Sequence, residues 1–346
     1  MLRFGTSTAV IATWLFLAAT TASLPAQPPS SAPEVIGIGP LFHIVADIDK
    51  SVAFYRGLLG LPPTAAAPRT FAADPELQQL YNLPGGRESA SVVRIPGSTL
   101  SLEFVEWRDV DRAPVQPRVQ DPGATVLMLT VRDLWKATAW LVEHGALMAG
   151  PSGAPVSIDD ARGKRRAVLL RDPDGFFIEL AQPDALPQTA ASNDILGATF
   201  AVTINDTDKT VRFYREAFGF QLEVGALFEP DIAWTNAVAG SGAQIRRSTA
   251  LVPGSSVRME FLEFKNIDRK RLRSRLQDPG TSMLQLSVRD VNAIVKASKA
   301  AGGSILTAGG VATLRHNSPI AIVGDSNNFF LEPMQPAPQA VTGNAK

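Results

Sequence analysis

The sequence DIDKSVAFYR at residues 47–56 returns as DTDKTVRFYR at residues 206–215. Four further stretches repeat in the same order: Ile95–Gly97 with Val252–Gly254, Leu102–Phe104 with Met259–Phe261, Gln120–Gly123 with Gln277–Gly280, and Phe176–Glu179 with Phe329–Glu332. The spacing between partners changes little along the chain, and the changes fall in expected loops, where insertions are tolerated. A repeat of this length indicates a duplicated domain rather than a short solenoid unit.

Each copy also contains a weaker repeat of its own. Residues 41–60 predict a strand, an Asp-containing turn and a helix, and residues 125–144 predict the same order, with Gly145 in a position typical of a helix end. Short strands joined by Pro-Gly or Asp-Pro-Asp-Gly turns follow each unit. We therefore expect two strand–helix–strand–strand–strand modules in each copy and four in the chain, which is an α+β fold.

Composition limits the function classes. The chain has 346 residues, with 33 Lys and Arg against 33 Asp and Glu, so it has no basic excess that would attract nucleic acid. It has no cysteine, which excludes disulfides, thiolate metal sites and cysteine nucleophiles. Only three histidines are present, and this limits any histidine-based metal chemistry.

The N-terminus is typical of a secretion signal. Arg3 precedes a short apolar run, and small residues lead to a plausible cleavage point after Ala26. The apolar run is shorter than the ~20 residues that a membrane span needs. We therefore predict a secreted or periplasmic protein with no membrane span in its mature chain. An uncleaved amphiphilic anchor is the alternative.

The remaining boundaries follow from the repeat and from runs of Pro, Ser and Ala. We predict a signal peptide at 1–26, a flexible leader at 27–35, a first domain at 36–183, a linker at 184–194, a second domain at 195–336 and a disordered tail at 337–346.

The ordered set of motifs resembles the vicinal oxygen chelate superfamily, which includes glyoxalase I, bleomycin-resistance proteins and type I extradiol dioxygenases. The resemblance covers about residues 36–183 and 195–336. It implies two tandem glyoxalase/bleomycin-resistance/dioxygenase-type domains, whose modules pair so that the mixed sheets curl into cups. Members bind a divalent metal or an organic ligand inside the cup, while helices cover the outside. A homodimer is also compatible with the resemblance.

Alternation along the strands predicts which side chains enter the cups. Leu284, Leu286 and Val288 are apolar and should face the helices, so Met283, Gln285 and Ser287 should face the cup. The same argument places two glutamates in each cup: Glu103 with Glu179 in the first, and Glu260 with Glu332 in the second. The resemblance implies that these strand positions supply carboxylate ligands. The alternative is that each glutamate is solvated or paired with an arginine at a strand end.

The histidines that the family uses are missing. The resemblance implies a His or Gln ligand seven residues before each turn aspartate, and those positions hold Pro40, Val126, Thr199 and Met283. A 2-His-1-carboxylate iron site therefore cannot form, which argues against ring cleavage. His43 has the parity of the helix side, where it would be a structural histidine, although a one-residue bulge would turn it into the cup.

Two functions remain open. The first is a binding module that holds a small organic molecule in a cup, without a full metal triad. The second is a divalent-metal-dependent lyase, isomerase or epimerase in which Glu179 or Glu332 acts as the base. Its metal, weakly bound Mg²⁺, Mn²⁺ or Ca²⁺, would use Glu103, Glu179, Glu260, Glu332 and, if turned, His43. The segment at 71–87 could be a lid over the first cup or a helix that completes the core.

Overall fold

The computed structural model describes residues 34–62, 69–160, 163–186, 194–229, 232–314 and 317–337, all within one compact unit. The predicted signal peptide, nearly all of the leader and tail, most of the linker, and His316 lie outside the described residues. Among the described helices, none is both long and apolar enough to cross a membrane.

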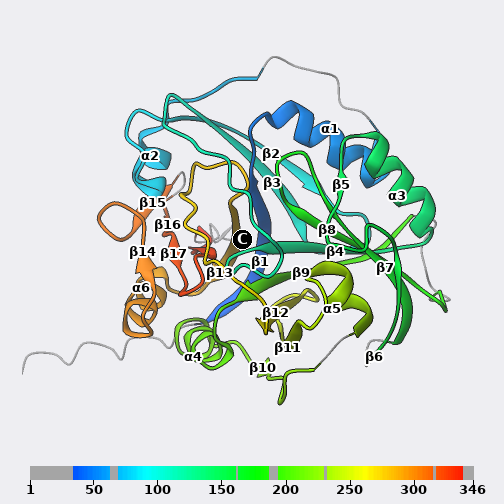
Figure 1. The fold of residues 1–346 in the computed structure, drawn as a ribbon. Coiled ribbons are helices and arrows are strands. Elements are labelled where there is room, and N and C mark those ends of the chain that lie inside the picture. The colour runs from blue at the N-terminus through cyan, green and yellow to red at the C-terminus, as the bar shows by residue number, and fades with distance from the viewer. Residues whose placement is uncertain are drawn as a thin grey trace, which may run out of the picture. The chain divides into compact units, whose positions relative to one another are not determined.

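The first copy contains two modules in the predicted order (Figure 1). Module 1 consists of β1 (Val35–Ile44), α1 (Ile48–Leu58), α2 (Pro75–Tyr81), β2 (Arg87–Arg94) and β3 (Ser101–Arg108). Module 2 consists of β4 (Thr125–Val131), α3 (Leu134–Glu143), β5 (Leu147–Met148), β6 (Val156–Asp160), β7 (Gly163–Arg171) and β8 (Phe177–Pro183).

The second copy repeats this order. Module 3 consists of β9 (Ile195–Ile204), α4 (Thr207–Phe218), β10 (Leu222–Glu223), α5 (Ile232–Val238), β11 (Gln244–Leu251) and β12 (Arg258–Lys265). Module 4 consists of β13 (Ser282–Val288), α6 (Val291–Ala300), β14 (Ser304–Ile305), β15 (Ala312–Leu314), β16 (Ser318–Ile320), β17 (Val323–Gly324) and β18 (Phe330–Met334). All four modules therefore begin with a strand and a helix and end with paired strands, and in module 1 the described residues contain two strands after α1 and α2, namely β2 and β3.

An aspartate begins the main helix of every module. Asp47, Asp133, Asp206 and Asp290 each adopt an extended backbone and accept a hydrogen bond from a backbone N–H three residues on. This satisfies a helix-terminal donor that would otherwise lack a partner, and a cap of this kind stabilises a helix by roughly 1 kcal/mol. The repeated aspartate explains why the helices begin where the sequence motif predicts.

The modules do not pair within their own copy. β1 pairs antiparallel with β13, with Leu41 opposite Leu284, and β4 pairs antiparallel with β9, with Leu127 opposite Phe200. One nine-stranded sheet therefore joins modules 1 and 4, and the other joins modules 2 and 3. We call the concave faces of these sheets the 1–4 cup and the 2–3 cup.

This pairing corrects one prediction. Glu103 shares its sheet with Glu332, and Glu179 shares its sheet with Glu260, so the expected pairs Glu103 with Glu179 and Glu260 with Glu332 are wrong. The segments that connect the modules of each copy are hydrogen-bonded to each other. The amide of Val115 donates to the carbonyl of Pro279 at 2.7 Å.

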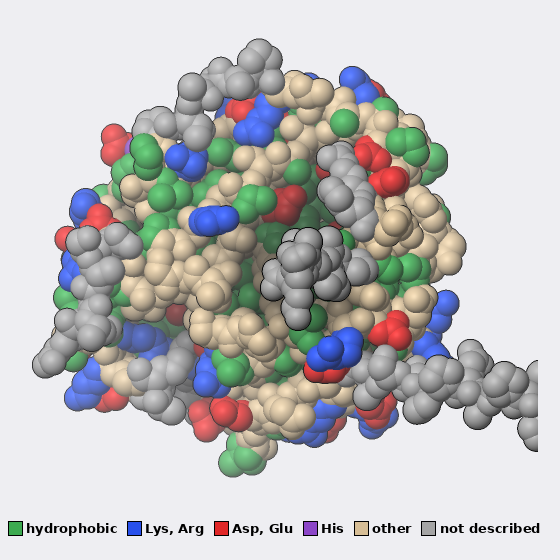
Figure 2. Space-filling view, turned by 180° about the vertical axis from the view of Figure 1, so that it is seen from behind, with side chains coloured by type: hydrophobic (Ala, Val, Ile, Leu, Met, Phe, Trp, Pro, Cys, Tyr) green, Lys and Arg blue, Asp and Glu red, His purple; other side chains and the backbone are tan. Residues whose placement is uncertain are grey.

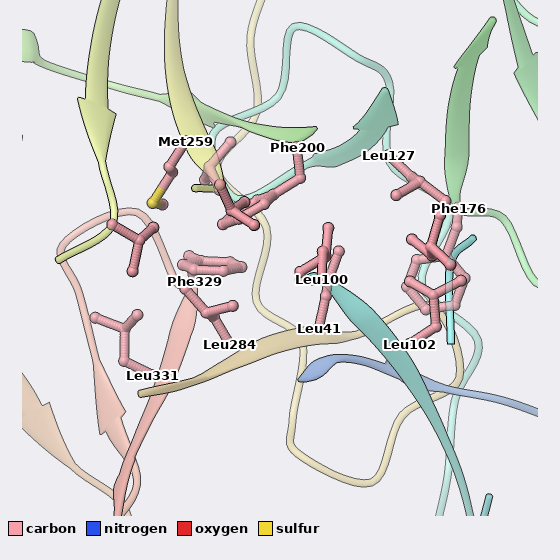
Figure 3. Packing of buried hydrophobic residues seen from close by; sticks show 14 of the residues in the cluster. Leu41, Leu100, Leu102, Leu127, Phe176, Phe200, Met259, Leu284, Phe329 and Leu331 are labelled. Atoms are coloured by element: carbon pink, nitrogen blue, oxygen red, sulfur yellow. The ribbon is translucent and has the colours of Figure 1, made fainter. Parts of the chain in front are cut away.

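The main core lies on the helix side of both sheets. Leu41, Leu102 and Leu284 of the 1–4 sheet and Leu127 and Phe200 of the 2–3 sheet belong to one buried cluster, and Figure 3 shows their side chains pointing towards one another. The predicted alternation of β4 is confirmed. Leu127, Leu129 and Val131 lie in this cluster, whereas Val126 and Met128 belong to the cluster of the 2–3 cup.

Each cup contains its own apolar cluster, completed by a short helix. In the 1–4 cup, Leu80 and Tyr81 of α2 are buried together with Phe42, Trp107 and other apolar residues. In the 2–3 cup, α5 buries Trp234, Ala237 and Val238. The segment at 71–87 thus contains a helix that packs into the cup of modules 1 and 4, and Leu80 and Tyr81 are part of the cup's interior.

Candidate functional site

Glu332 lies inside the 1–4 cup and is only 2% exposed. It stands on β18 directly beside Gln285 of the parallel strand β13, and the Gln285 side-chain amide donates a hydrogen bond to it at 2.7 Å. The Tyr81 hydroxyl on α2 donates a second hydrogen bond to this carboxyl. Neutral donors from two other elements therefore fix its position.

The surroundings of Glu332 favour its protonated form. The pKa of Glu332 is raised to about 8, chiefly by burial and also by the nearby carboxyls of Glu103 and Glu88, against the lowering effect of the two donors. Burial also raises the pKa of Glu103 to about 7. Ordinary glutamates ionise near pH 4.3, so these two carboxyls keep a proton at a pH where exposed glutamates have lost theirs.

Glu179 and Glu260 occupy the equivalent places in the 2–3 cup, and both are buried. The indole Nε1 of Trp234, on α5, donates a hydrogen bond to Glu179 at 2.7 Å. Leu169 of β7 lies opposite Glu179 in the strand register. The buried Arg165 is four residues before Leu169 on the same strand, so it faces the same side of the sheet as Glu179. Glu179 thus has an aromatic donor as its partner, and Arg165 is a buried cation on the same face of the sheet.

The two cups share one design. A short helix from one module places an aromatic donor on the final-strand glutamate of the partner module: Tyr81 on Glu332, and Trp234 on Glu179. Neither contact is predicted by local patterns in the sequence, because each joins residues from different copies. The apolar spacing of Leu77, Leu80 and Tyr81 was the only signal in the sequence.

His43 lies on the helix side, as its parity predicted. It is buried against Phe176, with ring centroids 3.8 Å apart, and burial lowers its pKa to about 3. The two irregularities of β1, between Val35 and Gly37 and between Ile38 and Leu41, both precede His43, so they do not turn this residue into the cup. The fold therefore places a neutral His43 in the core, away from the glutamates.

The donor set of the 1–4 cup does not fit a divalent cation well. Within the described residues, no group of three or more His, Cys, Asp or Glu side chains could hold a metal ion. Glu332 and Glu103 have raised pKa values, and a cation would have to displace their protons. Gln285 is a further oxygen donor at this place. Alternation put it in the cup, but only the register of β13 with β18 brings it to Glu332.

One face of the molecule has a hollow in which hydrophobic side chains gather, with acidic side chains beside it (Figure 2). An apolar concavity with a few polar groups is the usual form of a small-molecule site. Inside the 1–4 cup, Phe42, Val105, Met283 and Phe330 are buried apolar side chains, and Glu103, Gln285 and Glu332 are the polar groups.

This chain belongs to the Glyoxalase/Bleomycin resistance protein/Dioxygenase superfamily, whose family model matches residues 37–180 and 198–312. The match confirms the predicted family, and the fold class of two tandem domains with curled mixed sheets is confirmed with it.

Solved structures of glyoxalase I from Zea mays are similar in fold. One is 15% identical and covers 88% of this chain and 92% of its own, with a TM-score of 0.53. A point mutant of the same plant protein is 14% identical and covers 88% and 94%, with a TM-score of 0.56. No curated protein matches this chain in sequence. At such low identity, the likeness concerns the fold alone.

Proposed function

We propose that this protein is exported and binds a small organic molecule in the 1–4 cup, without a full metal triad. The observation that carries the proposal is the environment of Glu332, a buried carboxyl whose pKa burial raises to about 8 beside Glu103, whose pKa burial raises to about 7. A protonated carboxyl can donate a hydrogen bond, and an ionised one can accept. The pair therefore suits a ligand with an oxygen acceptor, such as a carbonyl, next to a hydroxyl donor.

A second candidate is an enzyme of the lyase, isomerase or epimerase type. The same raised pKa values favour it, because a general base works best when its pKa lies near the working pH. In this candidate, one carboxylate of the Glu103–Glu332 pair removes a proton next to a carbonyl of the ligand, and the proton stays on that carboxyl until it is returned. The predicted weakly bound Mg²⁺, Mn²⁺ or Ca²⁺ ion would first have to displace protons from these carboxyls, and if bound it would supply a positive charge for the carbonyl oxygen.

The experiment compares small molecules released from the purified mature protein with those released from two variants. Glu332→Gln changes the proposed site, and Glu179→Gln makes the matched change in the other cup. Mass spectrometry should find a released compound in the wild type and in Glu179→Gln, but much less in Glu332→Gln. An equal yield from all three proteins, or loss only in Glu179→Gln, would place the ligand elsewhere.

Metal binding in the cups is tested by a separate measurement. Thermal melts with and without Mn²⁺ should show little shift in the wild type if the cup binds without metal. A shift that Glu332→Gln or Glu179→Gln abolishes would support the metal-dependent candidate and identify its cup.

Export is tested by mass spectrometry of the protein outside the cytoplasm. The mature N-terminus is expected near Gln27, because small residues precede it. Detection of an intact Met1 on that protein would contradict the proposed signal peptide.

A further inference from the structure

A cavity of about 650 Å³ lies between α1 and α3, the main helices of modules 1 and 2, which run side by side on the helix side of the sheets (Figure 1). The turn between β7 and β8 closes its third side. The side chains of Lys50, Ala53 and His144 on its rim are exposed, so the cavity opens to solvent. It is separate from both cups, whose residues lie on the opposite faces of the sheets.

An aromatic pair forms one wall. The indole of Trp140 stacks on the ring of His144, with centroids 3.8 Å apart and planes at 12°. The same indole lies directly against Gly57 of α1, where an added Cβ would come within 2.2 Å of it. Phe54 is the next ring, 5.8 Å from Trp140. A large side chain between the two helices keeps them apart and leaves the cavity beside it.

Carboxylates form the opposite wall. Asp174 accepts hydrogen bonds from the backbone N–H of Ala46 at 2.9 Å and from the Ser51 hydroxyl at 2.5 Å. Asp172 accepts one from the Tyr55 hydroxyl at 2.8 Å. These donors are neutral, and Lys50, the one lysine of the lining, is already paired with Asp47 at 2.9 Å. Burial raises the pKa of Asp172 to about 7 and also raises the pKa of Asp174. A cation in the cavity would favour the ionised form of both carboxyls.

The second copy provides an internal comparison. It repeats the contact between a helix tyrosine and a turn aspartate: the Tyr214 hydroxyl lies 3.5 Å from Asp325, as the Tyr55 hydroxyl lies beside Asp172. However, the positions of Trp140 and His144 are occupied by Ala297 and Ala301. Asp174 is matched by Asn327, whose amide donates to Thr210 at 3.1 Å and to Asp325 at 3.0 Å. The aromatic wall and the second carboxylate are thus particular to the first copy and are not needed for the fold.

We propose that the cavity between α1 and α3 is a second ligand site, and that it takes an organic cation with an apolar body, such as a quaternary or protonated aromatic amine. The aromatic wall would face the apolar body and the positive centre, because aromatic faces attract cations. Asp174, and Asp172 once the bound cation favours its ionised form, would balance the ligand's charge. This site is independent of the ligand proposed for the 1–4 cup.

The test uses benzyltrimethylammonium as the probe and isothermal titration calorimetry on the full mature protein. Benzyl alcohol and benzoate are the neutral and anionic counterparts. The cation should bind saturably and at least tenfold more tightly than either counterpart. Trp140→Ala and Asp174→Asn, which introduce the residues of the second copy, should each weaken binding about tenfold, equal to about 1.4 kcal/mol. Glu332→Gln should leave this binding unchanged.

Several results would overturn the proposal. The first is the absence of saturable binding of the cation up to about 10 mM. The second is that benzoate binds as tightly as the cation. The third is that both cavity variants bind the cation with the affinity of the wild type. A thermal melt of each variant shows whether it folds. Should Asp174→Asn fail to fold, because it supports Ala46 and Ser51, His144→Ala replaces it and must weaken binding by removing the stacked ring.

Discussion

Glu332 should make the stability of the protein depend on pH in a recognisable way. Its pKa is about 8 in the folded protein and near the usual 4.5 in the unfolded chain, so unfolding releases a proton between these two values. The free energy of unfolding must then fall as pH rises through this window, by up to about 1.4 kcal/mol per pH unit. Below pH 4.5 both states are protonated and this effect vanishes.

Glu332→Gln removes the titrating group, so its stability relative to the wild type should rise steadily from pH 5 to pH 8. Urea unfolding at several pH values measures this difference. Glu179→Gln controls for the loss of a buried carboxyl as such. Parallel profiles for the wild type and Glu332→Gln would mean that the carboxyl is ionised throughout, and the proposed binding mode would fail with it.

His43 should have an effect on the acid side. Burial lowers its pKa to about 3, whereas an unfolded chain takes up the proton near pH 6.5. Stability from this residue is therefore present above pH 6.5 and is lost as pH falls towards 3. His43→Leu keeps an apolar group of similar size and also removes the buried Nδ1, which has no hydrogen-bond partner.

His43→Leu should therefore flatten the loss of stability between pH 6.5 and pH 4.5, as measured by thermal melts in buffers of equal ionic strength. If variant and wild type lose stability in parallel over this range, His43 is protonated in the folded protein and its environment is more polar than the structure indicates.

At the scale of the elements, α2 and α5 matter more than their length suggests. Each has seven residues, yet each delivers the aromatic donor that satisfies a buried carboxyl of another module. Leaving a buried hydrogen-bonding group without its partner costs about 1–3 kcal/mol. The stability of each cup should thus be sensitive to these single side chains.

Trp234→Phe keeps most of the apolar contact but removes the donor to Glu179, and it should lower the free energy of unfolding by about 1–3 kcal/mol. Trp135→Phe is the matched control, because Trp135 is 57% exposed and its change should cost less than about 0.5 kcal/mol. Chemical denaturation gives both values. Equal effects of the two changes would mean that the Trp234 hydrogen bond adds nothing to stability.

Local patterns in the sequence predict the elements well for a physical reason. Alternation in β4 and β13, and the aspartates that begin the helices, depend on neighbours within a few residues. The same local signals placed Gln285, Glu103 and Glu332 on cup faces. They could not tell which carboxyls meet, because β4 and β13 are equivalent strands of the two copies and either offers β1 a similar edge. Tyr81 reaches Glu332 because β1 pairs with β13 and not with β4.

At the scale of the whole molecule, each cup takes one module from each copy. A single copy, residues 36–183, has only half of each sheet and would leave the edges of β1 and β4 without their partners β13 and β9. Unpaired edges of this kind favour association. Expressed alone, this fragment should form a dimer in which two copies complete each other's sheets.

Light scattering after size-exclusion chromatography measures the mass of this fragment. A stable, folded monomer would show that modules 1 and 2 can pair with each other, and that the exchange in the intact chain depends on the connecting segments alone.

The pairing of β1 with β13 also imposes an order in time. Synthesis delivers a chain from its N-terminus, and domains begin to fold as they emerge. β4 and β9 can meet once residue 204 has appeared, so the sheet of modules 2 and 3 can start to close early. β1 must wait for residues 282–288, and Glu332 arrives later still, on the last strand. During that interval Tyr81 lacks its hydrogen-bond partner Glu332, and the apolar face around Tyr81 is not yet covered. A chaperone that recognises exposed hydrophobic segments would bind there.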